Sequence, residues 1–308
     1  MKIAFFGSSH FAVLALEALI KSREDIVSVV TQPDKKKGRH LHVGFTDIKA
    51  VALEAGLSVF QPQDINSSKS AAFLKNLNAD LFVIVAYGQI LSQEVLDIPK
   101  VLPVNIHASL LPKYRGAAPI NWAIMRGEKV TGVTIMKVTR KMDSGPIIMQ
   151  EEVVIADGDD AVSLEEKVRE LGAKLLLESV AAIKNKKFRL DEQDERKVVL
   201  APKLKKDDGR IDWARTAVEI NNLVRGAMPW PGAFTHYKGK LFKVYRSKVT
   251  RAQGNSPGEI AGISKEGIAV CTGKDSLLIQ ELQIEGKRRM SAREFVAGHR
   301  ISPQDKFC

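Results

Sequence analysis

Three polar side chains in the sequence are of the types that acyl transfer requires. Asn105 and His107 stand two residues apart at the end of an apolar segment, 101–106, and on an extended chain such side chains point the same way. Asp143 follows a second strand-like segment, 132–138. An amide donor, an imidazole and a carboxylate that converge at one sheet edge form an acyl-transfer site.

Each of these residues also has a common structural role. A histidine after a strand is often a hydrogen-bonded residue of the core, and an aspartate in a turn often caps its own backbone. The segment 108–119 is predicted to be a rigid loop, because it contains Pro112, Gly116 and Pro119. Ser109 lies in this loop, and nothing in the sequence indicates a general base that would activate its hydroxyl. We therefore expect Ser109 to shape the pocket and not to act as a nucleophile.

Two other motifs are too incomplete to support a cofactor. The turn after the first strand places Ser9 where a dinucleotide-binding fingerprint needs its second glycine, which argues against NAD. His40 and His42 have no cysteine nearby and no third ligand in reach by spacing, so no metal site is predicted there.

The elements that position these residues alternate between strand and helix in the first half of the chain. This alternation predicts a parallel sheet with helices on both faces. In such sheets, ligands bind beyond the carboxyl ends of the strands. The strand-like segments are 2–6, 26–31, 57–60, 79–86, 101–106 and 132–138, and the helical ones are 11–20, 46–55, 70–77 and 118–126.

A charged stretch, 185–208, resembles a linker, and the character of the chain changes after it. Five short strand candidates with glycine-containing turns suggest a small OB-like β-barrel. They are 233–237, 240–246, 259–263, 267–271 and 277–282. The predicted organisation is therefore a Rossmann-like catalytic domain over 1–189, a linker over 190–208 and an OB-like domain over 209–308.

The net charge of +11 is concentrated near the end of the chain. Residues 205–308 hold 19 Lys and Arg against 11 Asp and Glu, so this part alone carries +8. A basic part beside a near-neutral one is typical of a polyanion-binding appendage, although a solvated basic surface has the same composition.

Composition points to a globular cytoplasmic protein. Apolar residues make up 44% and charged residues 27% of the chain, which is normal for a globular fold. The two cysteines, Cys271 and Cys308, cannot form a disulfide framework or a metal cluster. No apolar run approaches the ~20 residues that span a bilayer, and the N-terminus lacks the apolar stretch of a signal peptide.

The longest motif resembles the signature of the folate-dependent formyltransferases. It consists of residues 105–112 (NIHASLLP) followed by 115–120 (RGAAPI), and residues 143–145 (DSG) resemble the catalytic aspartate loop of that family. Further matching runs are 11–12 (FA), 31–34 (TQPD), 86–88 (AYG) and 230–233 (WPGA), so the resemblance covers the whole chain. Residues 8–10 (SSH) depart from the family's usual Thr-Pro-Glu, which affects the shape of the first loop and not the chemistry.

The sequence demands no metal, NAD or oligomer, so we expect a cytoplasmic monomer that uses neither cofactor. The resemblance implies what this enzyme does. It would transfer the formyl group of 10-formyltetrahydrofolate to the amino group of methionyl initiator tRNA, giving N-formylmethionyl-tRNA for translation initiation. Asn105 and a protonated His107 would stabilise the oxyanion, and Asp143 would favour the charged imidazole and relay the amine proton.

The resemblance also assigns binding residues. The folate-binding residues would be Tyr87, Gly88, Ser109, Leu110, Leu111 and Pro112. For tRNA, the resemblance points to Lys35, Lys36, Lys37 and Arg39 in a basic loop over 34–44. The excess of positive charge near the end of the chain adds a second set of candidate tRNA-binding residues: Lys205, Lys206, Lys240, Lys243, Arg246, Lys248, Lys287, Arg288 and Arg289.

Other functions remain open at this level. A formyltransferase for a small amine or an amino-sugar nucleotide would share the three catalytic residues, but it does not need the basic C-terminal part. A hydrolase or dehydrogenase acting on the same folate would leave that charge unexplained. In a non-catalytic RNA-binding protein, the Asn105, His107 and Asp143 pattern would be a coincidence.

Overall fold

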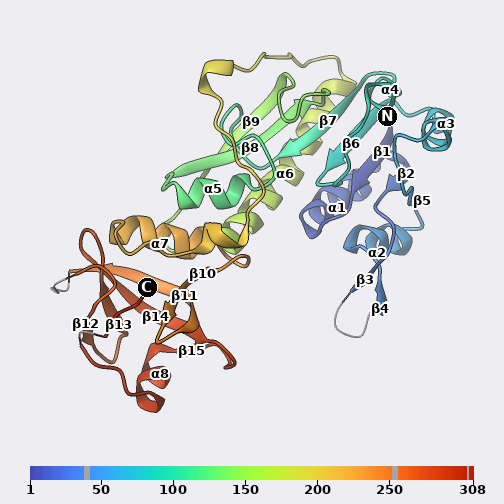
Figure 1. Cartoon of the computed structure of the whole chain (residues 1–308). Helices are drawn as coiled ribbons and strands as arrows, with labels where there is room; N and C mark the ends of the chain where they lie inside the picture. Colours follow the sequence, from blue (N-terminus) through green and yellow to red (C-terminus); the bar gives the residue numbers. More distant parts are fainter. Residues whose placement is uncertain (38–41, 252–255, 304) are drawn as a thin grey trace. The chain divides into compact units, whose positions relative to one another are not determined.

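The computed structural model describes residues 1–37, 42–251, 256–303 and 305–308, with the backbone alone for 35–37 and 42–43. The described residues form two compact units (Figure 1). The first unit contains residues 1–116, 130–154 and 165–200. The second contains residues 117–129, 155–164 and 201–308.

The first unit is built on a seven-stranded sheet with the order β5-β2-β1-β6-β7-β8-β9. Five neighbouring strands are parallel, and β8 and β9 are antiparallel additions at one side. This confirms the predicted α/β fold. The strands are β1 (Lys2–Gly7), β2 (Asp25–Val30), β5 (Val59–Phe60), β6 (Leu81–Val85), β7 (Leu102–His107), β8 (Val130–Lys137) and β9 (Ile147–Val154).

Short and long helices connect these strands, together with a two-stranded antiparallel hairpin of β3 (Lys35–Lys37) and β4 (His42–Gly44). The helices are η1 (His10–Ala12), α1 (Val13–Lys21), α2 (Asp47–Glu54), α3 (Ser68–Asn76), α4 (Gln93–Leu96), η2 (Glu195–Lys197) and α6 (Ala161–Lys184), most of which belongs to this unit.

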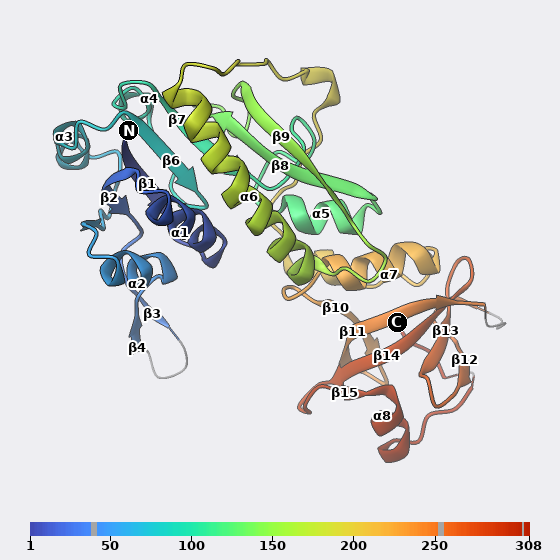
Figure 2. The same ribbon diagram turned by 180° about the vertical axis from the view of Figure 1, so that it is seen from behind.

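Helices α1 and α6 lie side by side against one face of the sheet (Figure 2). A Cβ atom on Gly172 of α6 would stand 3.1 Å from Ile106 of β7, so the glycine lets the helix approach this strand. Side chains alternate along a strand, and therefore Asn105 and His107 face away from α6. That opposite face carries a buried cluster that includes Phe6, Phe82 and Leu96.

The second unit combines a helix pair with an antiparallel sheet. Its helices are α5 (Pro119–Met125), η3 (Lys206–Gly209), α7 (Ala217–Gly226) and α8 (Ala292–Gly298). The strands are β10 (Ala233–Tyr237), β11 (Lys240–Thr250), β12 (Ile260–Ile263), β13 (Ile268–Cys271), β14 (Ser276–Ile284) and β15 (Met290–Ser291). The strand order is β10-β11-β14-β13-β12, with β15 on β14, so the sheet contains all five predicted strands and β15 in addition.

The last residues of the chain connect the two outer strands of that sheet. Cys308 exchanges two backbone hydrogen bonds with His236 of β10, and the backbone N–H groups of Ile260 and Phe307 donate to Asp305 and Gly258, respectively. Residues 305–308 therefore lie between β10 and the start of β12. The core beneath them includes Trp213, whose indole N–H donates to Thr235.

The two units divide the chain differently from the boundaries predicted at 189 and 209. Residues 190–200 belong to the first unit, because Asp191 exchanges two backbone hydrogen bonds with Ile147 of β9. Residues 117–129 belong to the second, because Asn121 of α5 donates to the carbonyls of Gly226 and Met228 after α7. Among the described residues, no helix is long and apolar enough to cross a membrane.

Candidate active site

His107 ends β7 and is held by the loop that follows it. Its Nε2 lies 2.9 Å from the carbonyl oxygen of Tyr114, and the side chain is almost entirely buried. A carbonyl oxygen only accepts, so Nε2 carries the proton in this contact. Tyr114 itself has a φ of +62°, in the left-handed region, which turns its carbonyl back toward the strand end.

The segment after His107 forms the predicted loop, and a buried threonine of β8 holds it by hydrogen bonds. Thr134 donates its hydroxyl proton to the carbonyl of Ser109 at 2.6 Å and accepts from the N–H of Leu111 at 3.1 Å. Gln150 of β9 donates to the Leu111 carbonyl, and the Ser109 hydroxyl donates to the carbonyl of Lys113. The Ser109 hydroxyl is therefore engaged within the loop.

Asp143 reaches the same place from the turn between β8 and β9. Its Oδ2 stands 3.7 Å from Nδ1 of His107 and accepts a hydrogen bond from the N–H of Gly116 at 2.8 Å. The backbone of Asp143 is left-handed, with a φ of +49°. The structure thus brings together a histidine and an aspartate that are far apart in the chain. Both side chains are largely shielded from water. Opposite charges interact more strongly in such a buried place than at the protein surface.

Asn105 lies on the same side of β7 as His107, in the middle of the sheet. Its neighbours in register are Ile84 of β6 and Met136 of β8. The side chain is half-buried and makes no hydrogen bond within the described part of the chain. Its amide protons are therefore available to an incoming oxygen.

Sequence reasoning missed two residues beside this site. The buried Arg115 donates twice to Oε1 of Gln193, and Nε2 of Gln193 donates to the carbonyls of Asp143 and Gly145. Arg115 lies in the motif that resembles the family signature, and its place there could have marked it as a site residue. Gln193 stands in a charged segment without periodicity, and nothing in the sequence distinguishes it.

The first two expected folate-binding residues follow β6. Tyr87 is buried in the cluster that includes Phe6, and its hydroxyl has no hydrogen bond partner among the described residues. Burial raises the pKa of the Tyr87 phenol. Gly88 is exposed with a φ of +86°, and a Cβ atom there would lie 2.8 Å from the amide nitrogen of Gln32. Glycine therefore keeps the backbone accessible at this point.

The other four expected folate-binding residues belong to the loop after His107. Ser109 and Leu111 are buried, whereas Leu110 and Pro112 are partly exposed. Leu110 packs against Gly132 of β8, where a Cβ atom would be 2.5 Å from the leucine side chain. Leu110 and Pro112 therefore offer side chains to a ligand, and the two buried residues offer mainly backbone.

The basic residues predicted for a polyanion fall into separate groups. Lys35, Lys36 and Lys37 form β3, and Arg39 lies outside the described residues. Lys205 and Lys206 are exposed at the start of η3.

A bulge in β11 brings three of the predicted cations to one face of the sheet. The register with β14 shifts on both sides of Arg246, so that Val244 and Ser247 both point inward. Two residues of each strand lie between the pairs Val244–Leu282 and Ser247–Ile279, so the alternation of sides is reversed beyond that point. As a result Lys243, Arg246 and Lys248 share the outer face, which we call the β11 face. None of the three has a carboxylate partner among the described residues.

The remaining cations are placed around this sheet. Lys240 is exposed at the start of β11, and Lys287, Arg288 and Arg289 are exposed beyond β14. The two arginines are paired: Arg288 with Glu294 at 2.7 Å and Arg289 with Glu281 at 2.6 Å.

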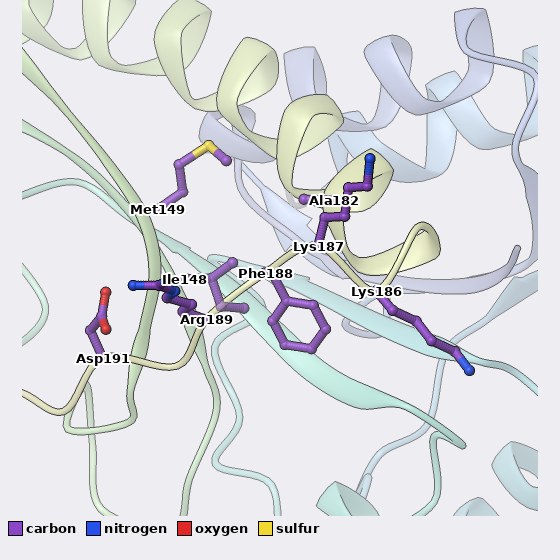
Figure 3. Close-up of a pocket in the computed structure, with 8 residues that line it drawn as sticks. All are labelled: Ile148, Met149, Ala182, Lys186, Lys187, Phe188, Arg189 and Asp191. Atoms are coloured by element: carbon purple, nitrogen blue, oxygen red, sulfur yellow. The ribbon is translucent and has the colours of Figure 1, made fainter.

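A pocket of 470 Å³ lies in the first unit between β9, the end of α6 and the segment after it. Figure 3 shows the Lys186 and Lys187 side chains extending away from Ile148 and Met149. Its lining residues include none of the predicted catalytic or folate-binding residues. Among the described residues, no cluster of three His, Cys, Asp or Glu side chains is arranged to hold a metal ion.

Comparison with known families and proteins gives matches along most of the chain. The model described as "Formyl transferase" matches residues 1–180, and that described as "Formyl transferase, C-terminal domain" matches residues 203–300. A methionyl-tRNA formyltransferase of Caldanaerobacter subterraneus subsp. tengcongensis is 42% identical over 98% of both chains. One of Thermodesulfovibrio yellowstonii is 44% identical over 97% of this chain and 96% of its own.

A solved structure has a similar fold. The N-formyltransferase from Helicobacter canadensis, in complex with folinic acid and dTDP-3-aminofucose, superposes with a TM-score of 0.70 at 20% identity. The match covers 91% of this chain and 99% of that one. At this level of identity the likeness shows the fold alone.

The contact between His107 and Tyr114 predicts which ring nitrogen is protonated. We expect Nε2 to carry a proton at neutral pH, because its partner is a carbonyl oxygen. Nitrogen chemical shifts of ¹⁵N-labelled histidine, assigned with a His107→Gln variant, measure this. A signal from an unprotonated His107 Nε2 at neutral pH would contradict the geometry.

Proposed function

This chain belongs to the formyl transferase family, and we propose that Asn105, His107 and Asp143 carry out its reaction. The enzyme transfers the formyl group of 10-formyltetrahydrofolate to the amino group of methionine on initiator tRNA, giving N-formylmethionyl-tRNA for translation initiation. The observation that carries the proposal is the approach of Asp143 to His107 at 3.7 Å, on the side of β7 that also bears Asn105.

The chemistry sets two requirements. The amine nitrogen forms a bond to the formyl carbon, and the bond from that carbon to N10 of the folate breaks. The amine loses a proton and N10 gains one. Negative charge develops on the formyl oxygen as the amine attacks, so the site needs hydrogen-bond donors for that oxygen and a base for the amine proton.

Asn105 and His107 are suited to the first requirement. The Asn105 amide has no competing hydrogen bond among the described residues, and Nδ1 of His107 is 3.7 Å from Asp143, too far for a hydrogen bond. When His107 is protonated, Nδ1–H becomes a charged donor while Nε2–H stays bound to the Tyr114 carbonyl. The ring is therefore oriented before the substrate arrives, which is the condition under which such donors are most effective.

Asp143 is suited to the second requirement, which is a base for the amine proton. Its Oδ2 is held by Gly116 and faces the imidazole, so it stabilises the imidazolium form. Its Oδ1 makes no hydrogen bond among the described residues, which leaves it able to accept the amine proton directly or through one water.

The folate would bind against the loop after β7 and the turn after β6. The accessible backbone of Gly88 and the partly exposed side chains of Leu110 and Pro112 support this. Tyr87, Ser109 and Leu111 would act by holding those segments in place, because their side chains are buried.

The tRNA would contact the basic residues outside the catalytic sheet. The β11 face supports this, because three cations without carboxylate partners on one face can grip consecutive phosphates without reading sequence. We propose the same role for Lys205, Lys206, Lys240 and Lys287, for the β3 lysines and Arg39, and, with their salt bridges exchanged for phosphates, for Arg288 and Arg289.

The alternative acceptor is a small amine or an amino-sugar nucleotide. One structure of similar fold was solved with such a nucleotide, but its identity to this chain is only 20%. The relatives at 42–44% identity over nearly the whole chain bear the name of the tRNA enzyme, and a small acceptor would leave the β11 face without a use. We also infer that the enzyme is a monomer, because one chain provides all three catalytic residues, and that it works in the cytoplasm, where initiator tRNA is used.

Removing each catalytic group should slow the reaction itself. We expect Asn105→Ala, His107→Ala and Asp143→Asn to lower kcat by about 100- to 1000-fold, because each removes a donor or base that acts as charge develops. Steady-state assays with methionyl initiator tRNA measure this, with the exposed Asn185→Ala and Asp157→Asn as controls. A near-normal kcat in all three variants would contradict the proposed roles.

Neutralising the β11 face should weaken tRNA binding and leave folate binding alone. We expect the triple variant Lys243→Gln, Arg246→Gln, Lys248→Gln to raise the KM for tRNA about tenfold or more and to reduce the slope of log KM against log salt by about 2–3. The matched control removes the same charge at the pocket of Figure 3: Lys186→Gln, Lys187→Gln, Arg189→Gln. Equal effects of the two triple variants would show that only net charge matters.

A further inference from the structure

We propose that Gln193 is a positioning residue for formyl transfer, whose side-chain amide holds the Asp143 turn in register with His107. The inference rests on the roles proposed above for His107 and Asp143. Gln193 belongs to the segment 190–200, which composition alone suggests is a linker, and it lies in the same unit as the site.

The Gln193 amide uses both of its ends. Nε2 donates to the carbonyl oxygens of Asp143 at 3.0 Å and Gly145 at 2.7 Å. Oε1 accepts from Nε and Nη2 of Arg115 at 3.0 and 2.8 Å. A carbonyl only accepts and a guanidinium only donates, so the orientation of the amide is fixed by its partners. A carboxylate lacks the donor, and an apolar side chain lacks both groups.

The Asp143 turn needs an external hold because its backbone conformation is unfavourable on its own. Asp143 has a left-handed backbone, which a non-glycine residue adopts only when its surroundings impose it. Gly145 turns so tightly that a Cβ atom would overlap the carbonyl of Lys137. The two carbonyls that Gln193 binds are the ones on either side of Ser144, at the centre of this turn.

Arg115 provides a fixed base for the Gln193 amide. It is buried, its backbone N–H donates to the carbonyl of Val199 at 2.9 Å, and its guanidinium also binds Glu195 at 2.8 Å. The next residue, Gly116, donates its N–H to Oδ2 of Asp143. Arg115 and Gly116 therefore hold Asp143 at two points: directly at its carboxylate and, through Gln193, at its main chain.

The consequence is a specific kinetic signature. Gln193 donates hydrogen bonds to the turn that carries Asp143, and it makes no hydrogen bond to a proposed folate- or tRNA-binding residue in the part of the chain that the structure describes. Its loss should displace the carboxylate from the imidazole while substrate binding stays intact. A misplacement of about 1 Å in a catalytic group can cost about 100-fold in rate.

The experiment compares Gln193→Glu and Gln193→Met, both close to glutamine in size, in the full-length enzyme. Glutamate keeps the acceptor for Arg115 and loses the donor, and methionine loses both. We expect each variant to lower kcat by about 10- to 100-fold, with both KM values within about threefold of wild type. The neighbouring Glu192→Gln is the control, because Glu192 is exposed and makes no hydrogen bond or ion pair within the described residues. Thermal unfolding verifies that the variants are folded; if one is not, the other serves alone.

A double-mutant cycle separates positioning from general stability. If Gln193 acts through Asp143, then Gln193→Glu should have little further effect on kcat in an Asp143→Asn background. A wild-type kcat for folded Gln193→Glu and Gln193→Met, or fully additive losses in the double variant, would overturn the inference. A near-normal Asp143→Asn would instead overturn the proposed function, so the two failures are distinguishable.

Discussion

The active site depends on the way one buried imidazole is held between two different partners. One nitrogen of His107 donates to the carbonyl of Tyr114, and the other faces the carboxylate of Asp143 at 3.7 Å. The first contact fixes the ring, and the second leaves Nδ1 without a hydrogen bond to the carboxylate. In the proposed mechanism, Nδ1–H of the protonated ring would donate to the developing oxyanion from an orientation that is set before the substrate arrives.

The rest of the first unit serves to bring those partners together. Strand β7 is paired on both sides and places Asn105 and His107 at the carboxyl end of the parallel strands, and Thr134 of β8 holds the loop that returns the Tyr114 carbonyl. The Asp143 turn then has to be held in a left-handed conformation. Backbone and side-chain hydrogen bonds from the segment 190–200 hold this turn. A segment that was predicted to be a linker therefore supports the proposed catalytic site.

Sequence reasoning predicted the features that follow from local periodicity and motif. The alternation of side chains along a strand predicted that Asn105 and His107 lie on one side, and the apolar runs predicted the strands of the parallel sheet. Contacts between distant segments have no local pattern, which is why Gln193 went unnoticed in a charged stretch. The bulge in β11 is equally hidden: simple alternation would point Arg246 inward with Val244, and only the shifted register turns it to the outer face. The pairing of α5 with α7, which joins segments about 100 residues apart, likewise has no local pattern in the sequence.

In the proposed mechanism, three side chains surround one transferred carbon unit. A crystal structure of the enzyme with an unreactive analogue of 10-formyltetrahydrofolate would show whether they do. We expect the formyl oxygen within about 3.2 Å of both the Asn105 amide nitrogen and Nδ1 of His107, with Asp143 still facing the ring. A formyl group bound away from these residues, in crystals of an enzyme preparation that is fully active with the natural cosubstrate in solution, would contradict it.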